Sequence, residues 1–209
     1  RFSNRLGQSQ VLHEALSRLK SSPAQPLDST QTRILDAELL SMQHRGVALR
    51  GEQQADFNRT SERMAALSTG FSNHVLDATQ NWSLVIHERA RLQGVPERAL
   101  EILASAAKEA GDQAADGSEP SAAEGPWRLG LDMPRYIPVI THAEDRSLRE
   151  TLYKAQVSRA SSGDLDNAPL IEEILQLRRE QAARLGYANW AELSLASKMA
   201  EDVSAVESL

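Results

Sequence analysis

Two histidine–glutamate pairs come closest, among all residues of this sequence, to a spacing that could support metal chemistry. A zinc-binding helix carries two histidines four residues apart, so that both imidazoles reach the ion while the glutamate after the first activates a water molecule. His13-Glu14 and His87-Glu88 each begin such an HExxH pattern, but a serine and an arginine occupy the positions of the second histidine. Any His-Glu dipeptide supplies half of the motif, so we interpret both histidines as structural or surface residues. The same interpretation applies to the remaining histidines, which are His44, His74 and His142.

Other catalytic and binding patterns are missing from the sequence. There is no GxSxG nucleophile elbow, no phosphate-binding GxxxxGK[ST] loop and no GxGxxG turn, and the lack of cysteine excludes thiolate chemistry. Residues 164–167 (DLDN) begin like a calcium loop without its glycine and final glutamate, and are better explained as a helix cap. Adjacent acids at 144–145 and 172–173 are expected in the first turns of helices, where they complement the helix dipole. The sequence therefore predicts no catalytic, no cofactor-binding and no metal-binding residue in this chain.

Length and composition describe an ordinary globular chain. Of 209 residues, 41% are hydrophobic and 25% are charged. No apolar run approaches the roughly 18 residues of a membrane-spanning helix. The net charge of −6 and the aromatic content of 4% disfavour binding to nucleic acid, which depends on cationic and stacking side chains. We expect a cytoplasmic protein with no nucleic-acid and no membrane partner.

The two ends of the sequence favour a portion of a longer polypeptide. The chain opens with residues 1–3 (RFS) rather than with methionine or a targeting segment. Near its end, Val203, Val206 and Leu209 recur at helical spacing, as in a helix that continues past the last residue. The alternative is a processed chain that is functionally complete.

Two helices are predicted at the start of the chain. Apolar residues at helical spacing indicate a helix over residues 6–20, which the proline-containing segment 21–26 ends. Ser29 or Thr30 is expected to cap a second helix that ends near Gly46.

The strongest periodic signal predicts one long helix from residue 52 to residue 78. Its apolar positions follow one another at intervals of three, four or seven residues, which is the spacing of a single helix face. They are Phe57, Met64, Leu67, Phe71, Val75 and Ala78. Gly70 costs such a helix about 1 kcal/mol relative to alanine, so we expect a neighbouring element to approach it closely.

Residues 81–132 change to a β pattern around a further helix. The segments 82–86 (WSLVI) and 127–132 (WRLGLD) predict two strands of a hairpin-like ribbon, which is marginal alone and must pack on helices. Between them, Pro96 and the apolar residues after it predict a helix that ends at Gly111. The acidic, small-residue segment 111–126 is expected to be a mobile loop.

Helical spacing returns in the last third of the chain. Residues 141–144 (THAE) fit a capping box before a helix over residues 148–155. Asn167 opens a further helix that Gly186 ends, and a short helix is expected after it. Helix would then make up roughly 60% of the chain, against a usual third. The predicted fold class is mainly α, with one multi-helix domain over residues 1–209 and a small two-stranded ribbon.

Three stretches carry a resemblance to a known family. They are 67–79 (LSTGFSNHVLDAT) with its sequel 82–86, then 131–140 (LDMPRYIPVI) with 148–155 (LRETLYKA), and finally 167–178 (NAPLIEEILQLR) through 185–190 (LGYANW) to 198–201 (KMAE). In order and spacing, they are similar to segments of the oligopeptidase A and thimet oligopeptidase family of zinc metallopeptidases. The resemblance covers most of residues 30–209.

The resemblance implies a mostly helical, clam-shaped enzyme whose two halves flank a channel that admits short peptides and excludes folded proteins. It also implies a zinc ion held by two histidines of an HExxH helix and a further glutamate, all of them C-terminal to the part represented here. The chain would then be a non-catalytic fragment of the enzyme, inactive by itself, that forms one wall of the substrate channel. Its partners would be the remaining C-terminal catalytic half and short peptide substrates.

Two other functions stay open. A helical interaction scaffold, complete as it stands, would bind a partner helix in a groove, and an inactive paralogue would keep the shell as a peptide-binding module. A fragment of the peptidase should expose a sizeable apolar area where the missing half packs, which a complete scaffold should not. The sequence beyond residue 209, read for HExxH, separates the three.

Overall fold

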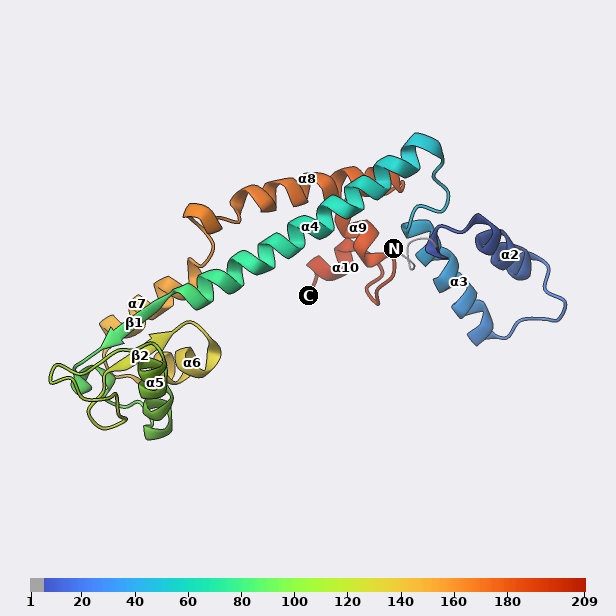
Figure 1. Ribbon diagram of the computed structural model, residues 1–209. Helices are drawn as coiled ribbons and strands as arrows, with labels where there is room; N and C mark the ends of the chain where they lie inside the picture. The colour runs from blue at the N-terminus through green and yellow to red at the C-terminus, as the bar shows by residue number, and fades with distance from the viewer. Residues whose placement is uncertain (1–5) are drawn as a thin grey trace. The chain divides into compact units, whose positions relative to one another are not determined.

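The computed structural model describes residues 6–209, which divide into two compact units. The first unit comprises the residues up to Ser68 together with Ile171–Leu209, and the second comprises Thr69–Leu170. Helices α4 (Gly51–Asn81) and α8 (Ala168–Arg184) each contribute to both units. Figure 1 shows that helices dominate, with one small sheet, so the prediction of a mainly α fold with a two-stranded ribbon is confirmed. The expectation of a single domain stays a prediction.

Most helices of the first unit follow the sequence pattern. α2 spans Gln10–Ser21, so it begins later and ends one residue beyond the predicted range of 6–20, and α4 contains the whole of the predicted long helix. Gly186, with a φ of 84°, ends the segment after α8, and α9 (Trp190–Leu195) and α10 (Val203–Glu207) follow it. None of the helices within residues 6–209 is both long and apolar enough to cross a bilayer.

Helix α3 (Ser29–His44) begins at an acidic cap that the sequence pattern did not predict. The carboxylate of Asp28 accepts a hydrogen bond from the backbone of Gln31 at 2.7 Å, and the Gln31 side chain accepts one from the backbone of Asp28 at 3.1 Å. The expected cap at Ser29 or Thr30 is therefore wrong, because the residue before them completes this reciprocal pair of hydrogen bonds.

Within the first unit, α8 packs along α4 through polar contacts as well as apolar ones. Arg63 of α4 donates two hydrogen bonds of 2.6 Å to the carboxylate of Glu173, and Arg184 donates to the hydroxyl of the buried Thr60 at 2.7 Å. Glu173 therefore lies in the second turn of α8, as part of an ion pair, and not in the first turn as predicted. The expected apolar face of α8 is only partly buried, since Leu175 is 58% exposed.

The second unit is built on two short antiparallel strands. β1 (Ser83–Ile86) pairs with β2 (Trp127–Gly130), with Ile86 opposite Trp127, which confirms the predicted ribbon. The 3-10 helix η1 (Arg89–Leu92) and helix α5 (Glu97–Glu109) lie between the strands in the chain.

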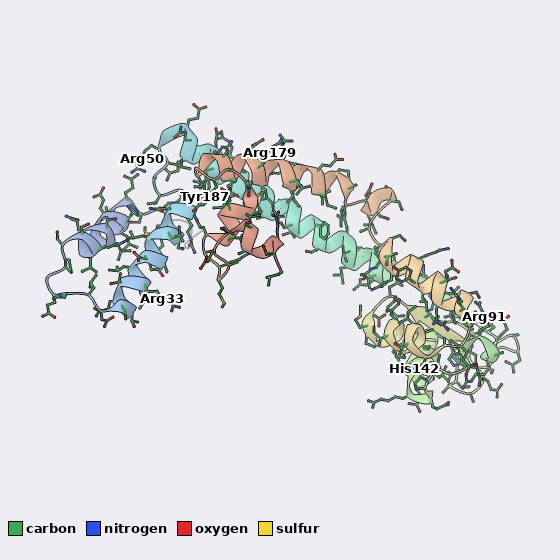
Figure 2. All side chains as sticks on the ribbon, turned by 180° about the vertical axis from the view of Figure 1, so that it is seen from behind. Arg33, Arg50, Arg91, His142, Arg179 and Tyr187 are labelled. Atoms are coloured by element: carbon green, nitrogen blue, oxygen red, sulfur yellow. The ribbon has the colours of Figure 1, made fainter. Side chains whose placement is uncertain are left out.

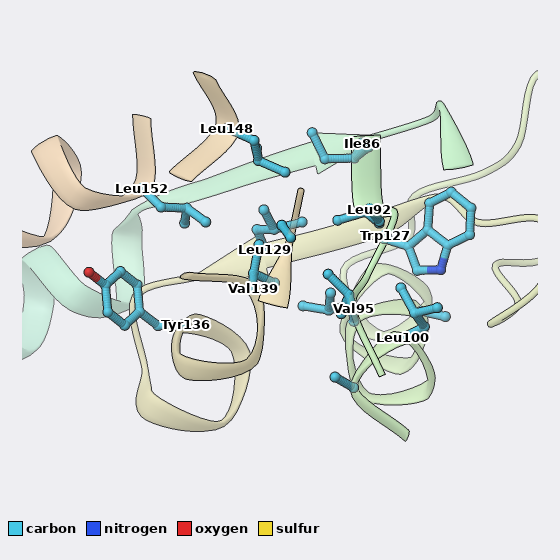
Figure 3. Close-up of a cluster of buried hydrophobic side chains, with 14 of the residues drawn as sticks. Ile86, Leu92, Val95, Leu100, Trp127, Leu129, Tyr136, Val139, Leu148 and Leu152 are labelled. Atoms are coloured by element: carbon cyan, nitrogen blue, oxygen red, sulfur yellow. The ribbon is translucent and has the colours of Figure 1, made fainter. Parts of the chain in front are cut away.

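One hydrophobic core joins this ribbon to the helices around it (Figure 3). Its largest fully buried side chains include Trp127, Leu129, Leu100, Leu148 and Leu152. They come from β2, from α5 and from α7 (Arg146–Val157), so the ribbon is covered as a two-stranded sheet requires.

Helix α6 (Met133–His142) was not predicted from the sequence, and it contains two prolines. Pro134 lies in the first turn, where a backbone N–H has no helical partner anyway, and Asp132 caps the helix by accepting from the backbone of Arg135. Pro138 stands inside the helix. β2 accordingly ends at Gly130 rather than at residue 132.

The start of α7 also corrects a prediction. Residues 141–144 do not form a capping box, because Thr141 and His142 belong to the end of α6. The cap is Asp145, whose carboxylate accepts from the backbone of Leu148 at 3.1 Å and from the guanidinium of Arg91 at 2.9 Å. Hydrogen bonds from Ser147, Arg91 and Leu148 hold the pKa of Asp145 far below its usual value.

The segment 111–126 contains turns but no helix or named strand, as expected. A pair of backbone hydrogen bonds of 3.0 and 2.9 Å joins Ser121 and Gly125, and the indole of Trp127 donates to the carbonyl of Ala122 at 3.2 Å. At its start, Asp112 accepts two hydrogen bonds of 2.6 and 2.7 Å from Arg128 of β2. The segment is thus attached to the ribbon at both ends, and its mobility stays a prediction.

Candidate functional site

The histidines considered from the sequence lie on separate elements. His13 is on α2, His74 is on α4, His87 follows β1 and His142 ends α6. Among residues 6–209, no three histidine, aspartate or glutamate side chains come close enough to hold a metal ion. The described residues therefore do not fit a zinc ion.

His44, at the end of α3, is the histidine with the most specific environment. Its Nε2 shares a hydrogen bond of 2.7 Å with the hydroxyl of Tyr187, and the two rings meet edge to face with 5.5 Å between their centroids. Partial burial lowers the pKa of His44, so its imidazole is neutral at pH 7. Tyr187 follows α8, so this contact ties α3 to the connection between α8 and α9.

Two hollows of the first unit meet at His44. One, of about 660 Å³, lies between α3 and the turn after α9, and the other, of about 300 Å³, lies between α9 and the end of α8. Both are lined by His44, Ser197 and Lys198, so we treat them as one continuous depression and call it the α3–α9 groove.

One face of α3 forms a wall of this groove. Its lining residues recur at intervals of three or four along the helix, and they are Arg33, Asp36, Ala37, Leu40, Ser41 and His44. The cations Arg33 and Lys198 lie on opposite walls, and Figure 2 marks Arg33 on α3. The single acid of the lining, Asp36, is paired with Lys20 at 2.5 Å. The groove therefore carries a net positive charge in a chain whose net charge is −6.

A second hollow, of about 660 Å³, lies in the second unit between the end of α4, α5 and β2. It also contains two arginines, but both are neutralised within the fold. Arg128 is bound by Asp112, which lowers the pKa of that carboxyl, and Arg135 is paired with Asp132. The remaining acid of its lining, Glu109, has no cationic partner among the described residues, so this hollow offers an anionic ligand no free cation. The α3–α9 groove is therefore the stronger candidate site for an anionic ligand.

No motif in the sequence singles out the residues of this groove. The spacing of Arg33, Leu40 and His44 is a helix-face signal that could have been read, because the three fall on one side of α3. The opposing residues Tyr187 and Lys198 lie more than a hundred residues further along the chain, and no local pattern places them there.

Comparison with known proteins gives the class to which the chain belongs. Residues 139–209 match the model of peptidase family M3, and residues 1–54 match that of the neurolysin/thimet oligopeptidase N-terminal domain. The chain belongs to this family of peptidases, as the resemblance implied.

Individual relatives extend the similarity over nearly the whole chain. A probable cytosolic oligopeptidase A of Arabidopsis thaliana is 41% identical over 201 residues, which are 96% of this chain and 28% of that protein. A chloroplastic/mitochondrial organellar oligopeptidase A of the same plant is 41% identical over 210 residues, or 100% of this chain and 26% of the relative. Oligopeptidase A of Salmonella typhimurium is 38% identical over 207 residues, which are 96% of this chain and 29% of that protein. The chain thus spans just over a quarter of the length of the curated relatives it matches.

Proposed function

We propose that this chain is the non-catalytic, N-terminal-side part of a zinc-dependent oligopeptidase and forms one wall of the channel that receives short peptides. The zinc ion and the residues that hold it would belong to the remaining, C-terminal catalytic half. The contribution of this chain would be shape: it would limit the size of the substrate and position the peptide chain.

One observation carries this proposal. Similarity to oligopeptidase A relatives runs along 96–100% of the chain at 38–41% identity, while the chain accounts for only 26–29% of their length. A peptidase of this family therefore contains much more polypeptide than these 209 residues, and its activity involves that additional polypeptide.

Exposed apolar side chains support the presence of a further packing partner. On α6, Met133 and Ile137 are 53% and 48% exposed, and on α7, Tyr153 and Val157 are 57% and 63% exposed. Each pair is four residues apart, so each forms a short apolar stripe on one helix face. Contiguous apolar surface of this kind is typical of an interface rather than of a free surface.

The decisive experiment uses the complete open reading frame that contains this chain. We expect the full-length protein to cleave short unstructured peptides, to lose that activity to a chelator and regain it with zinc, and to leave a folded protein such as native lysozyme intact. The 209-residue chain alone should cleave no peptide and bind no stoichiometric zinc.

Each of the other outcomes points to a different function. One tightly bound zinc per 209-residue chain, or chelator-sensitive cleavage by it, would contradict the proposal. A reading frame that continues without HExxH would favour an inactive peptide-binding paralogue. A reading frame that stops at Leu209 would favour an interaction scaffold.

We also propose a cytoplasmic location. The cytosolic and the organellar relative are both 41% identical to this chain, so fractionation of cells that produce the full-length protein is the test. Recovery from the cytosolic fraction is the expected result, and recovery from organelles would overturn it.

A further inference from the structure

The two halves of the α3–α9 groove differ in chemistry. The larger half contains Arg33, Arg45 and Lys198 and has no unpaired acid among its lining residues, since Asp36 is bound to Lys20. Within the described part of the chain, Arg33 has no hydrogen-bond or ion-pair partner, and the ammonium of Lys198 donates only to the hydroxyl of Ser194 at 2.8 Å. Both cations are therefore available to an anionic group.

The smaller half of the groove adds a cluster of apolar side chains to the lining. It is lined by Leu185, Trp190 and Leu193, of which Leu193 is only 7% exposed. Arg178 covers one face of the Trp190 ring, with 5.2 Å from its guanidinium to the ring centroid. The indole is thereby held in place as a wall of the groove and presents apolar surface to it.

A neutral polar pair lies where the two halves of the groove meet. His44 lines both halves and shares its hydrogen bond with Tyr187, and burial lowers the pKa of its imidazole. The positive charge of the groove at neutral pH therefore comes from Arg33, Arg45 and Lys198, of which Lys198 lines both halves. A ligand that fits must carry a negative group and an apolar group a short distance apart.

We propose that the α3–α9 groove binds a peptide segment in which a carboxylate stands next to an apolar side chain. The carboxylate lies between Arg33 and Lys198, and the apolar side chain lies against Trp190 and Leu193. This inference rests on the proposed function, because it assigns part of the substrate preference to the wall that this chain forms. The carboxylate can come from the C-terminus of the peptide or from an acidic side chain.

The test measures binding of four matched N-acetylated peptides to the full-length protein by calorimetry. A chelator is present, so binding is read whether or not the protein hydrolyses peptides. The peptides end in Ala-Leu with a free carboxylate, in Ala-Leu-amide, in Glu-Leu-amide and in Gln-Leu-amide. The first two test a terminal carboxylate and the last two test an acidic side chain.

We expect a carboxylate-containing peptide to bind at least several-fold more tightly than its neutral counterpart. Each solvent-exposed charge pair is worth about 2-fold to 5-fold in affinity, so R33Q together with K198Q should remove a preference of about 10-fold. Replacing the leucine of the peptide by glycine should weaken binding by about 10-fold or more, because a buried leucine side chain is lost. The matched control R179Q removes an exposed arginine of α8 that does not line the groove, and it should change nothing.

Several outcomes would overturn the inference. Equal affinity for charged and neutral peptides in the unaltered protein would exclude the site. A double variant that weakens all four peptides alike, or that leaves the preference intact, would place carboxylate recognition elsewhere. Peptidase activity of the same preparation, measured with zinc, separates this result from the proposed function. A protein that cleaves peptides without a preference that depends on Arg33 or Lys198 fails only the groove proposal, whereas one that cleaves none fails the proposed function.

Discussion

Replacement of Gly94 by alanine should destabilise the second unit through two separable effects. Gly94 has a φ of 87°, in the left-handed region that residues with a side chain rarely adopt. A Cβ at this position would lie 2.3 Å from the backbone carbonyl oxygen of His142. That backbone has little freedom to move, because Glu144 donates a hydrogen bond of 2.8 Å to the carbonyl of Gln93 and Ala143 is buried.

The chain contains a matched control for the first effect. Gly111 has a φ of 80°, but a Cβ there would meet no atom within 4 Å. Left-handed backbone costs a residue other than glycine about 1–2 kcal/mol, so Gly111→Ala should lose roughly that amount. Gly94→Ala should lose a further 1–3 kcal/mol or so, because the overlap with backbone forces the core to shift.

Thermal unfolding followed by far-UV circular dichroism measures the difference between the two variants. For a chain of this size, each kcal/mol lowers the melting temperature by about 2–4 °C, so Gly94→Ala should melt roughly 2–12 °C below Gly111→Ala. Hydrogen exchange should show faster opening of α5 and β2 in Gly94→Ala. Equal melting temperatures for the two variants would refute the close approach of Gly94 to His142.

Three further substitutions test other contacts. Hydrogen bonds from Arg128 lower the pKa of Asp112, so the ionised carboxylate stabilises the fold at pH values above its unfolded pKa. This stabilisation is lost as the pH falls through the lowered pKa of the native state. Asp112→Asn should therefore reduce the loss of stability below about pH 4, measured by urea unfolding. Leu100→Ala should lower the free energy of unfolding by about 2–5 kcal/mol, whereas Ile102→Ala, at a position that is 39% exposed, should cost under about 1 kcal/mol. Asp28→Ala should cost about 1 kcal/mol through loss of the α3 cap, and Ser29→Ala should be nearly neutral.

Periodicity predicted the elements whose positions are fixed by burial. The long helix, the two strands and α5 all carry apolar residues at the spacing of one face, and the structure places them as predicted. The glycine inside the long helix also predicted a close neighbour at Gly70, and a Cβ there would lie 3.3 Å from the side chain of Leu170. In these cases the local pattern and the tertiary contacts agree.

Prolines and caps were the main sources of error in the sequence-based predictions. No helix was predicted over residues 133–142, which contain Pro134 and Pro138, yet a proline in the first turn removes no helical hydrogen bond, and Asp132 supplies a cap. At Asp28 and Asp145, an acidic cap replaced the hydroxyl cap that was expected. Several adjacent residues could have capped each helix, and only the backbone geometry selects one of them.

The candidate site could not have been derived from the sequence, because the role of a charged residue depends on its partner in space. Arg128 and Arg33 are the same residue type, and nothing in the sequence distinguishes their roles. Each lines a different hollow of about 660 Å³. Arg128 is neutralised by Asp112, which comes sixteen residues earlier, whereas the acid beside Arg33 is paired with Lys20. Only the second arrangement leaves a cation for a ligand. In a chain with a net charge of −6, two unneutralised cations in a groove that also contains a tryptophan are therefore the feature of this unit that best supports the proposed recognition of a peptide segment.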